Sequence, residues 1–103
     1  MNKLISAVVV SVAVLVSGAA VAGDAAAGKA KSATCAGCHG AAGVSGNPLW
    51  PNLAGQKEAY IVKQLKALRD GTRTDPMMSP MAKPLTDDDI NNLAAYFSSL
   101  ACK

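Results

Sequence analysis

The chain has 103 residues, a formal net charge of +3 and only 4% aromatic residues. Its ten lysines and arginines are dispersed, and no basic run with interleaved aromatic residues is present, which argues against nucleic-acid binding. After the first 22 residues there is no strand-like alternation, no internal repeat and no phosphate-binding glycine loop. The sequence therefore predicts an all-α fold.

Residues 1–22 have the features of a cleaved signal peptide. Lys3 supplies a short positive region, an apolar run covers residues 4–16, and residues 20–22 (Ala-Val-Ala) form a small-x-small cleavage site. The alternative is an uncleaved anchor, because the apolar stretch approaches the roughly 20 residues of a membrane-spanning helix. The cleavage site favours removal, so the sequence predicts an exported protein with a mature domain of residues 23–103.

Residues 24–33 are rich in alanine and predict the first helix, with Asp24 as its N-cap. Gly28 lies in the middle of this helix, where glycine costs about 1 kcal/mol relative to alanine. We therefore expect another backbone or an aromatic ring to approach closely at Gly28, with simple tolerance of the glycine as the alternative.

The run Cys35-Ala36-Gly37-Cys38-His39 is typical of a c-type haem attachment site. Its two thiols can form thioethers with the two porphyrin vinyl groups, and its histidine then lies under the iron as the proximal ligand. A Cys-x-x-Cys pair also occurs in zinc sites and dithiol oxidoreductases. However, only Cys102 and no second histidine lie outside the motif, and no βαβ context surrounds it. A solvent-exposed His39 without a role is the remaining alternative.

A covalently bound haem would also stabilise the domain. The mature chain has about 80 residues, a size at which the hydrophobic core is small and a metal, disulfide or cofactor is often needed. The motif therefore predicts one covalent haem c around which the helices pack.

Residues 40–56 predict a loop, because glycines and prolines interrupt any apolar period. Trp50 is expected to pack on the haem edge or cap the core, with exposure for partner docking as the alternative. Residues 57–70 predict a second helix that ends before Gly71. We assign its apolar stripe to the core rather than to a binding site, and the stripe consists of Ile61, Leu65 and Leu68.

Residues 72–84 predict an irregular segment, because three prolines interrupt both helix and strand. Three of the four methionines of the chain lie here, namely Met77, Met78 and Met81. In another protein they would be gap-filling residues. Downstream of a haem-attachment motif, they predict a segment that delivers a thioether sulfur to the open face of the iron.

Residues 86–100 predict the third main helix. Thr86 and Asp89 have the spacing of a capping box, and the acidic run 87–89 lies at the positive end of the helix dipole. We therefore interpret these aspartates as capping charges rather than as a catalytic or metal site. The apolar face of the helix consists of Ile90, Leu93, Ala94, Phe97 and Leu100.

Taken together, these blocks resemble the class I c-type cytochromes, in particular the bacterial cytochrome c5/c553 group and each half of the dihaem cytochrome c4. The resemblance covers essentially the whole mature chain. It implies an all-α class I cytochrome c fold, with three main helices and loops around one haem. The blocks that carry it are Gly-Asp-Ala-Ala-Ala-Gly-Lys, Cys-Ala-Gly-Cys-His-Gly, Trp-Pro-Asn-Leu-Ala-Gly-Gln, Met-Ser-Pro-Met and Leu-Thr-Asp-Asp-Asp-Ile-Asn-Asn-Leu-Ala-Ala-Tyr-Phe.

The resemblance also implies roles for individual residues. Cys35 and Cys38 would carry the thioethers, and His39 would be the proximal ligand. Pro51 would offer its backbone carbonyl to the Nδ1–H group of His39, which would orient the ring. Matching the methionine block to the family places the distal sulfur at Met78.

Spacing alone also leaves Met77 open as the distal ligand and, less well, Met81. Gly28 would meet the C-terminal helix near Leu93 and Tyr96, which would explain a glycine in the middle of a helix.

The implied function is that of a periplasmic electron carrier without substrate turnover. It would pass single electrons from a membrane quinol-oxidising complex, or another donor, to a terminal oxidase or reductase through a His/Met-ligated iron. The dispersed, mixed charge suits brief encounters with such partners. The alternatives are a haem with an open distal position that binds CO, NO or oxygen, a haem subunit docked on a dehydrogenase, and a dithiol oxidoreductase.

Cys102 departs from the family pattern, because cytochromes of the c5 group often have a cysteine pair and this one stands alone. Two interpretations are open. An unpaired cysteine in an exported protein forms an intermolecular disulfide, and hence a covalent dimer, or it stays a free C-terminal thiol without a role.

Overall fold

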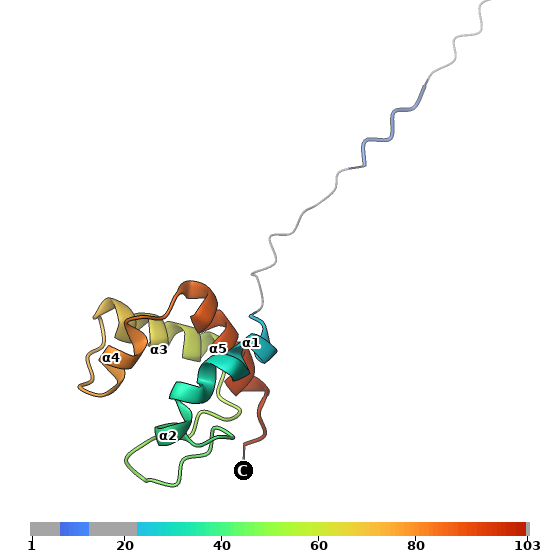
Figure 1. Cartoon of the computed structure of the whole chain (residues 1–103). Coiled ribbons are helices and arrows are strands. Elements are labelled where there is room, and N and C mark those ends of the chain that lie inside the picture. Colours follow the sequence, from blue (N-terminus) through green and yellow to red (C-terminus); the bar gives the residue numbers. More distant parts are fainter. Residues whose placement is uncertain (1–6, 13–22, 103) are drawn as a thin grey trace, which may run out of the picture.

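The computed structural model describes residues 7–12 and 23–102. Its helices are gathered into one body, and no strand occurs among the described residues (Figure 1). The predicted signal peptide lies mostly outside the described part of the chain, and so does its cleavage site. Only residues 7–12 of it are described, and they have no regular secondary structure. Within these limits, none of the helices is both long enough and apolar enough to span a bilayer.

Helix α1 (Ala25–Lys31) begins at the predicted N-cap. The carboxylate of Asp24 accepts hydrogen bonds from the backbone N–H groups of Ala26 and Ala27, two donors that have no partner within the helix. The last predicted turn tightens into a short 3-10 helix, η1 (Ser32–Thr34). Helix α2 (Ala36–His39) follows directly and contains most of the Cys-x-x-Cys-His motif.

Helix α1 packs across helix α5 (Asp87–Ser99), so the two ends of the domain lie side by side (Figure 1). The predicted close approach at Gly28 is confirmed. A Cβ atom at this position would overlap the backbone carbonyl group of Asn92 and would lie 2.8 Å from the Cβ atom of Tyr96. Tyr96 was expected here, and the carbonyl of Asn92 takes the place expected for the neighbouring Leu93.

Helix α3 (Glu58–Asp70) ends as predicted at Gly71, whose φ of 88° places it in the left-handed region that favours glycine. Helices α3 and α5 pack together through a buried cluster of Ile61, Leu93, Ala94 and Phe97. Leu93, Ala94 and Phe97 lie at helical spacing on α5, and Ile61 with the partly buried Leu65 one turn later packs against them from α3.

Helix α5 begins with the predicted capping box. The backbone N–H of Asp89 donates to the Thr86 hydroxyl over 3.1 Å, and the backbone N–H of Thr86 donates to the Asp89 carboxylate over 3.0 Å. Asp87 pairs with Arg69 of α3 at 2.7 Å, and Asp89 lies 3.6 Å from the ammonium group of Lys31. The aspartates thus cap the helix and link it to two others.

The prediction that residues 72–84 are irregular throughout is wrong for its centre, where helix α4 (Met78–Ala82) forms. Pro80 is the third residue of this helix. The N–H groups of the first turn have no intrahelical acceptor, so a proline there removes no hydrogen bond. Pro76 and Pro84 lie outside the helix on either side, and they set its limits rather than prevent it.

Candidate functional site

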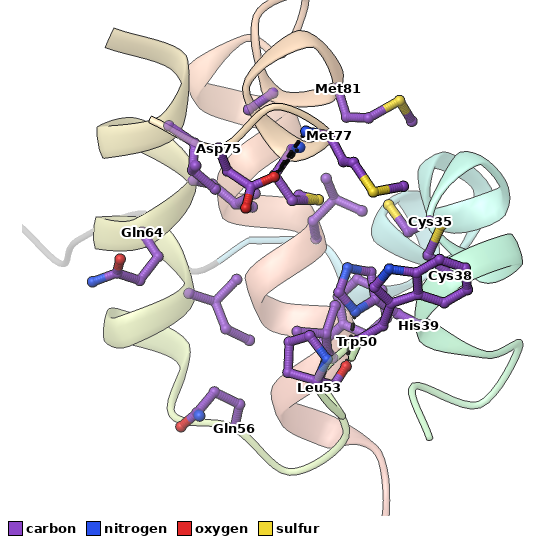
Figure 2. A pocket seen from close by; sticks show the side chains of 18 of the residues that line it. Cys35, Cys38, His39, Trp50, Leu53, Gln56, Gln64, Asp75, Met77 and Met81 are labelled. Atoms are coloured by element: carbon purple, nitrogen blue, oxygen red, sulfur yellow. Dashed lines mark hydrogen bonds between the residues drawn. The ribbon is translucent and has the colours of Figure 1, made fainter. Parts of the chain in front are cut away.

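A cavity of about 800 Å³ lies between α2, the loop of residues 40–56, α3, the segment that contains α4, and α5 (Figure 2). Most of the side chains that line it are apolar. Every candidate site residue from the sequence borders it, namely Cys35, Cys38, His39, Pro51 and Met78. Tertiary packing therefore brings residues up to 43 positions apart in the sequence to one cavity.

Helix α2 places the attachment motif at one side of this cavity. Cys35 is the N-cap of α2, and Cys38 and His39 form its last turn, so all three side chains come from a single turn of chain. The two thiols are partly buried and free, and Figure 2 shows them close to one another beside the imidazole. His39 is buried, with only 6% of its surface exposed.

The imidazole of His39 is held by the loop that follows it. Its Nδ1 atom lies 2.8 Å from the backbone oxygen of Pro51, and since a carbonyl only accepts, Nδ1 carries the proton of this hydrogen bond. The structure gives Nε2 no hydrogen-bond partner among the described residues. With the proton on Nδ1, the neutral form of the ring would present the lone pair of Nε2 on its free side, as a metal-binding histidine does.

The loop reaches His39 because it folds back at Gly43. The carbonyl of Gly43 accepts hydrogen bonds from the backbone N–H groups of Leu53 and Ala54, and Gly43 itself has a φ of 72°. The Asn52 side chain also accepts a hydrogen bond from the backbone of Ser45 over 2.7 Å. These bonds cross the neck of the loop and position the Pro51 carbonyl.

The electrostatics of the Cys35 thiol do not favour a dithiol oxidoreductase. Burial raises the pKa of the Cys35 thiol and the neighbouring Cys38 adds to this, while a hydrogen bond with Thr34 opposes it. Reactive redox cysteines have a lowered pKa, because the thiolate is the nucleophile.

The three methionines of the α4 segment line the same cavity. Met78 is partly buried, whereas 54% of Met77 and 44% of Met81 is exposed. Figure 2 shows the thioethers of Met77 and Met81 toward the side of the cavity where the cysteines lie. Burial thus sets Met78 apart from the two methionines that spacing left open.

Sequence reasoning missed part of the wall. Ile61 belongs to the buried core, as predicted, but Ile61, Leu65 and Leu68 also line the cavity, so the stripe of α3 is not core alone. Helical periodicity cannot distinguish a stripe that faces protein from one that faces a cofactor. Trp50 is half-buried and borders the cavity, in agreement with one of its two predicted positions.

Asp75 is a second residue that was missed. Its carboxylate lines the cavity and accepts hydrogen bonds from the backbone N–H groups of Met77 and Met78, at 2.9 and 2.8 Å. These bonds lower the pKa of Asp75, that from Met78 most and that from Met77 next. An aspartate before a Pro-Met-Met sequence is the signal that could have indicated a turn of this kind.

The residues present fit a covalently bound haem. The cavity volume is within the range of cofactor sites, about 300–1,000 Å³, and its wall is mainly apolar, as a flat macrocycle requires. Two adjacent thiols and an imidazole with a free Nε2 occur on one part of the wall, and thioethers occur on another. This is the set of donors found in c-type cytochromes.

Comparison with known proteins gives the same result. Residues 25–101 match the family described as Cytochrome c. Cytochrome c4 of Pseudomonas aeruginosa is 46% identical over 99 residues, which are 96% of this chain and 49% of that protein. Cytochrome c-554(548) of Halomonas halodenitrificans is 49% identical over 81 residues, which are 76% of this chain and 98% of that protein.

A solved structure supports the fold. The crystal structure of reduced recombinant cytochrome c4 from Pseudomonas stutzeri aligns with a TM-score of 0.74 and 44% identity, over 78% of this chain and 47% of that one. The chain thus spans about half the length of its cytochrome c4 relatives and nearly all of cytochrome c-554(548). From this match and this geometry, the chain belongs to the cytochrome c family, whose cofactor is covalent haem c.

Proposed function

We propose that the protein is a monohaem periplasmic electron carrier whose haem is attached to Cys35 and Cys38 and ligated by His39 and Met78. The single observation that carries this proposal is the 2.8 Å hydrogen bond between His39 Nδ1 and the Pro51 carbonyl, at the wall of a cavity that both thiols and Met78 also line. It leaves Nε2 as the ring nitrogen available to the iron.

Bound haem would supply a one-electron Fe(III)/Fe(II) couple. The Pro51 carbonyl holds the His39 ring in one orientation and makes it a better donor. Met78 would contribute a soft thioether, which would favour Fe(II) and raise the reduction potential. If His39 and Met78 both bind the iron, no open position would remain for a substrate, which is why we propose a carrier rather than an enzyme.

The domain limits in this proposal are residues 1–22 as a removed signal peptide and 23–103 as the mature protein. The first contacts between the N-terminal end of the domain and α5 support this division. The backbone N–H of Asp24 donates to the Asn92 side chain over 2.8 Å, and a Cβ atom at Gly23 would overlap the carbonyl of Asn91. Cleavage before Gly23 would leave both contacts intact.

The proposed route for electrons is the exposed edge of the cavity. Leu49 is 84% exposed beside it, and the exposed Met77 and Met81 lie along the same cavity. An apolar rim of this kind suits short-lived contact with a donor such as a membrane quinol-oxidising complex and with a terminal oxidase or reductase as acceptor. Apart from the acidic run 87–89, the charged residues are dispersed, so the sequence has no large patch of one sign that would select a partner.

The test is an absorption spectrum of the protein matured in cells that attach haem c, taken oxidised, reduced, and reduced with CO. We expect a c-type spectrum with the far-red sulfur–iron band when oxidised and no change with CO. The mass of the purified protein should show one haem and no residues 1–22. A spectrum that shifts with CO would indicate a ligand-binding haem instead, and a dehydrogenase that co-purifies stoichiometrically would indicate an enzyme subunit.

Variants of the two neighbouring methionines assign the distal ligand. Met78→Leu should remove the far-red band and open the iron to CO. Met77→Leu is the matched control, because it makes the same change one residue away, and it should keep the band. The reverse result would assign Met77.

A further inference from the structure

Asp75 holds the turn from which both candidate methionine ligands extend. One carboxylate oxygen of Asp75, Oδ1, accepts hydrogen bonds from the backbone N–H groups of Met77, at 2.9 Å, and of Met78, at 2.8 Å (Figure 2). In return, the Asp75 backbone N–H donates to the Ser79 hydroxyl over 2.9 Å, and the Ser79 N–H donates to the Asp75 carbonyl over 3.0 Å. Four hydrogen bonds thus join one aspartate to the start of α4.

Helix α4 depends on these bonds. It has five residues, and isolated helices of that length are unstable in water. Its N-cap residue is Met77, which has no side-chain acceptor for the first-turn N–H groups. Within the described part of the chain, the Asp75 carboxylate and the Asp75 carbonyl are the acceptors that these groups reach.

The orientation of this turn decides which of the two thioethers is the more buried. Successive side chains on a helix point about 100° apart, so a rotation of the turn would exchange the positions of Met77 and Met78. In the structure Met78 is partly buried and Met77 is 54% exposed. The two bonds to Oδ1 fix the backbone at these two residues and therefore maintain this difference.

We propose that Asp75 is a positioning residue that selects Met78 as the distal ligand by fixing the Met77–Met78 turn. The inference rests on the proposed function, since it takes Met78 as the ligand. Asp75 acts through the position of its acceptor oxygen, and its negative charge strengthens the hydrogen bonds that this oxygen accepts. An asparagine has a side-chain oxygen at the same position and can replace it, whereas a glutamate keeps the charge but moves the oxygen by one methylene.

The experiment measures the competition of added imidazole for the iron in the oxidised, haem-loaded protein. Imidazole binds only when the thioether has left, so its apparent affinity reports the population of the open form. In Asp75→Ala, loss of two hydrogen bonds to a charged acceptor should raise this affinity about 10- to 100-fold and weaken the far-red band. Asp75→Asn keeps both hydrogen bonds in their weaker, neutral form, so its imidazole affinity should lie between those of the parent protein and Asp75→Ala.

Two further variants complete the design. Asp75→Glu should bind imidazole more tightly than Asp75→Asn. Comparison of these two variants tests the role of the oxygen position even if Asp75→Ala fails to fold or to take up haem. Asp88→Ala is the matched control, because Asp88 is an exposed aspartate with no hydrogen bond or ion pair among the described residues. It should leave the imidazole affinity unchanged.

Each result supports or overturns the inference. Unchanged imidazole affinity in Asp75→Ala overturns it, and so does an Asp75→Asn variant that binds imidazole more tightly than Asp75→Glu, because charge would then matter more than the position of the oxygen. If Met78→Leu keeps the far-red band, both the proposed ligand and its selection by Asp75 are wrong. If Met78→Leu loses the band while every Asp75 variant keeps the parent affinity, the proposed function stands and the inference alone fails.

Discussion

Replacing Gly28 with alanine sets two physical effects against each other. Alanine is the better helix former, by about 1 kcal/mol in a helix interior. In this fold, however, the added methyl group would overlap the backbone carbonyl of Asn92 and would lie 2.8 Å from the Cβ atom of Tyr96. Backbone atoms cannot move aside as a flexible side chain can, so α1 and α5 would have to separate.

The magnitude follows from these two terms. Overpacking of a tight contact typically lowers the free energy of unfolding by up to about 3 kcal/mol. We use this upper value because the overlap at Gly28 is with backbone atoms. After subtraction of the gain in helix propensity, Gly28→Ala should destabilise the domain by about 2 kcal/mol. For a domain of this size the midpoint of thermal unfolding should then fall by about 8–16 °C.

The assay is thermal unfolding of the haem-loaded protein followed by far-ultraviolet circular dichroism. Gly46→Ala is the matched control, because a Cβ atom there meets nothing within 4 Å and the φ of Gly46 is not positive. It should change the midpoint little. A Gly28→Ala protein as stable as the parent, or more stable, would show that helix propensity outweighs the contact and would refute the packing argument.

Three other predictions concern stability and oligomeric state. Leu93 is only 1% exposed and belongs to the α3–α5 core. Leu93→Ala should therefore lower the free energy of unfolding by about 2–5 kcal/mol in denaturant titrations. A smaller loss would mean that the surrounding side chains relax into the space left by the leucine. The pKa of Asp87 is lowered by its hydrogen bond with Arg69, and that of Asp89 by the backbone N–H of Thr86. The two ionised aspartates therefore stabilise the fold fully above the unfolded-state pKa of about 3.9, and this stabilisation is lost as the pH falls through their lower folded-state pKa values. We expect the melting temperature to decline below about pH 4, and a melting temperature that stays constant there would contradict the role of these aspartates. Cys102 is exposed and free, so a dimer band should form in oxidising buffer on a non-reducing gel and should disappear in Cys102→Ser; a monomer alone would favour the thiol without a role.

Several features of the fold could be predicted because their causes are local. Asp24 caps α1, Gly71 ends α3, and the Thr86–Asp89 capping box begins α5. In each case the residues that interact are within a few positions of one another, so side-chain chemistry and spacing suffice. The same is true of the attachment motif, whose two cysteines and histidine share one turn of helix.

Other features depend on where distant segments pack. Proline content alone predicted no helix at Met78–Ala82, because a composition rule does not state whether a proline falls in the first turn or in the interior. The stripe of α3 could be assigned to the core, but its second role in lining the cavity depends on what lies opposite. The close approach at Gly28 was expected from the sequence, whereas its partner, the carbonyl of Asn92, lies on another helix.

The sequence by itself determined that this protein is helical, that it has a haem-attachment motif and that three methionines follow at a suitable distance, because these are properties of short stretches of chain. Only the tertiary structure decided that the Pro51 carbonyl meets His39 Nδ1, that Met78 is more buried than Met77, and that Asp75 holds the turn between them. The physical reason is that a loop folded back at Gly43 and helices crossed at Gly28 set the positions of side chains far apart in sequence, and no local spacing encodes those positions.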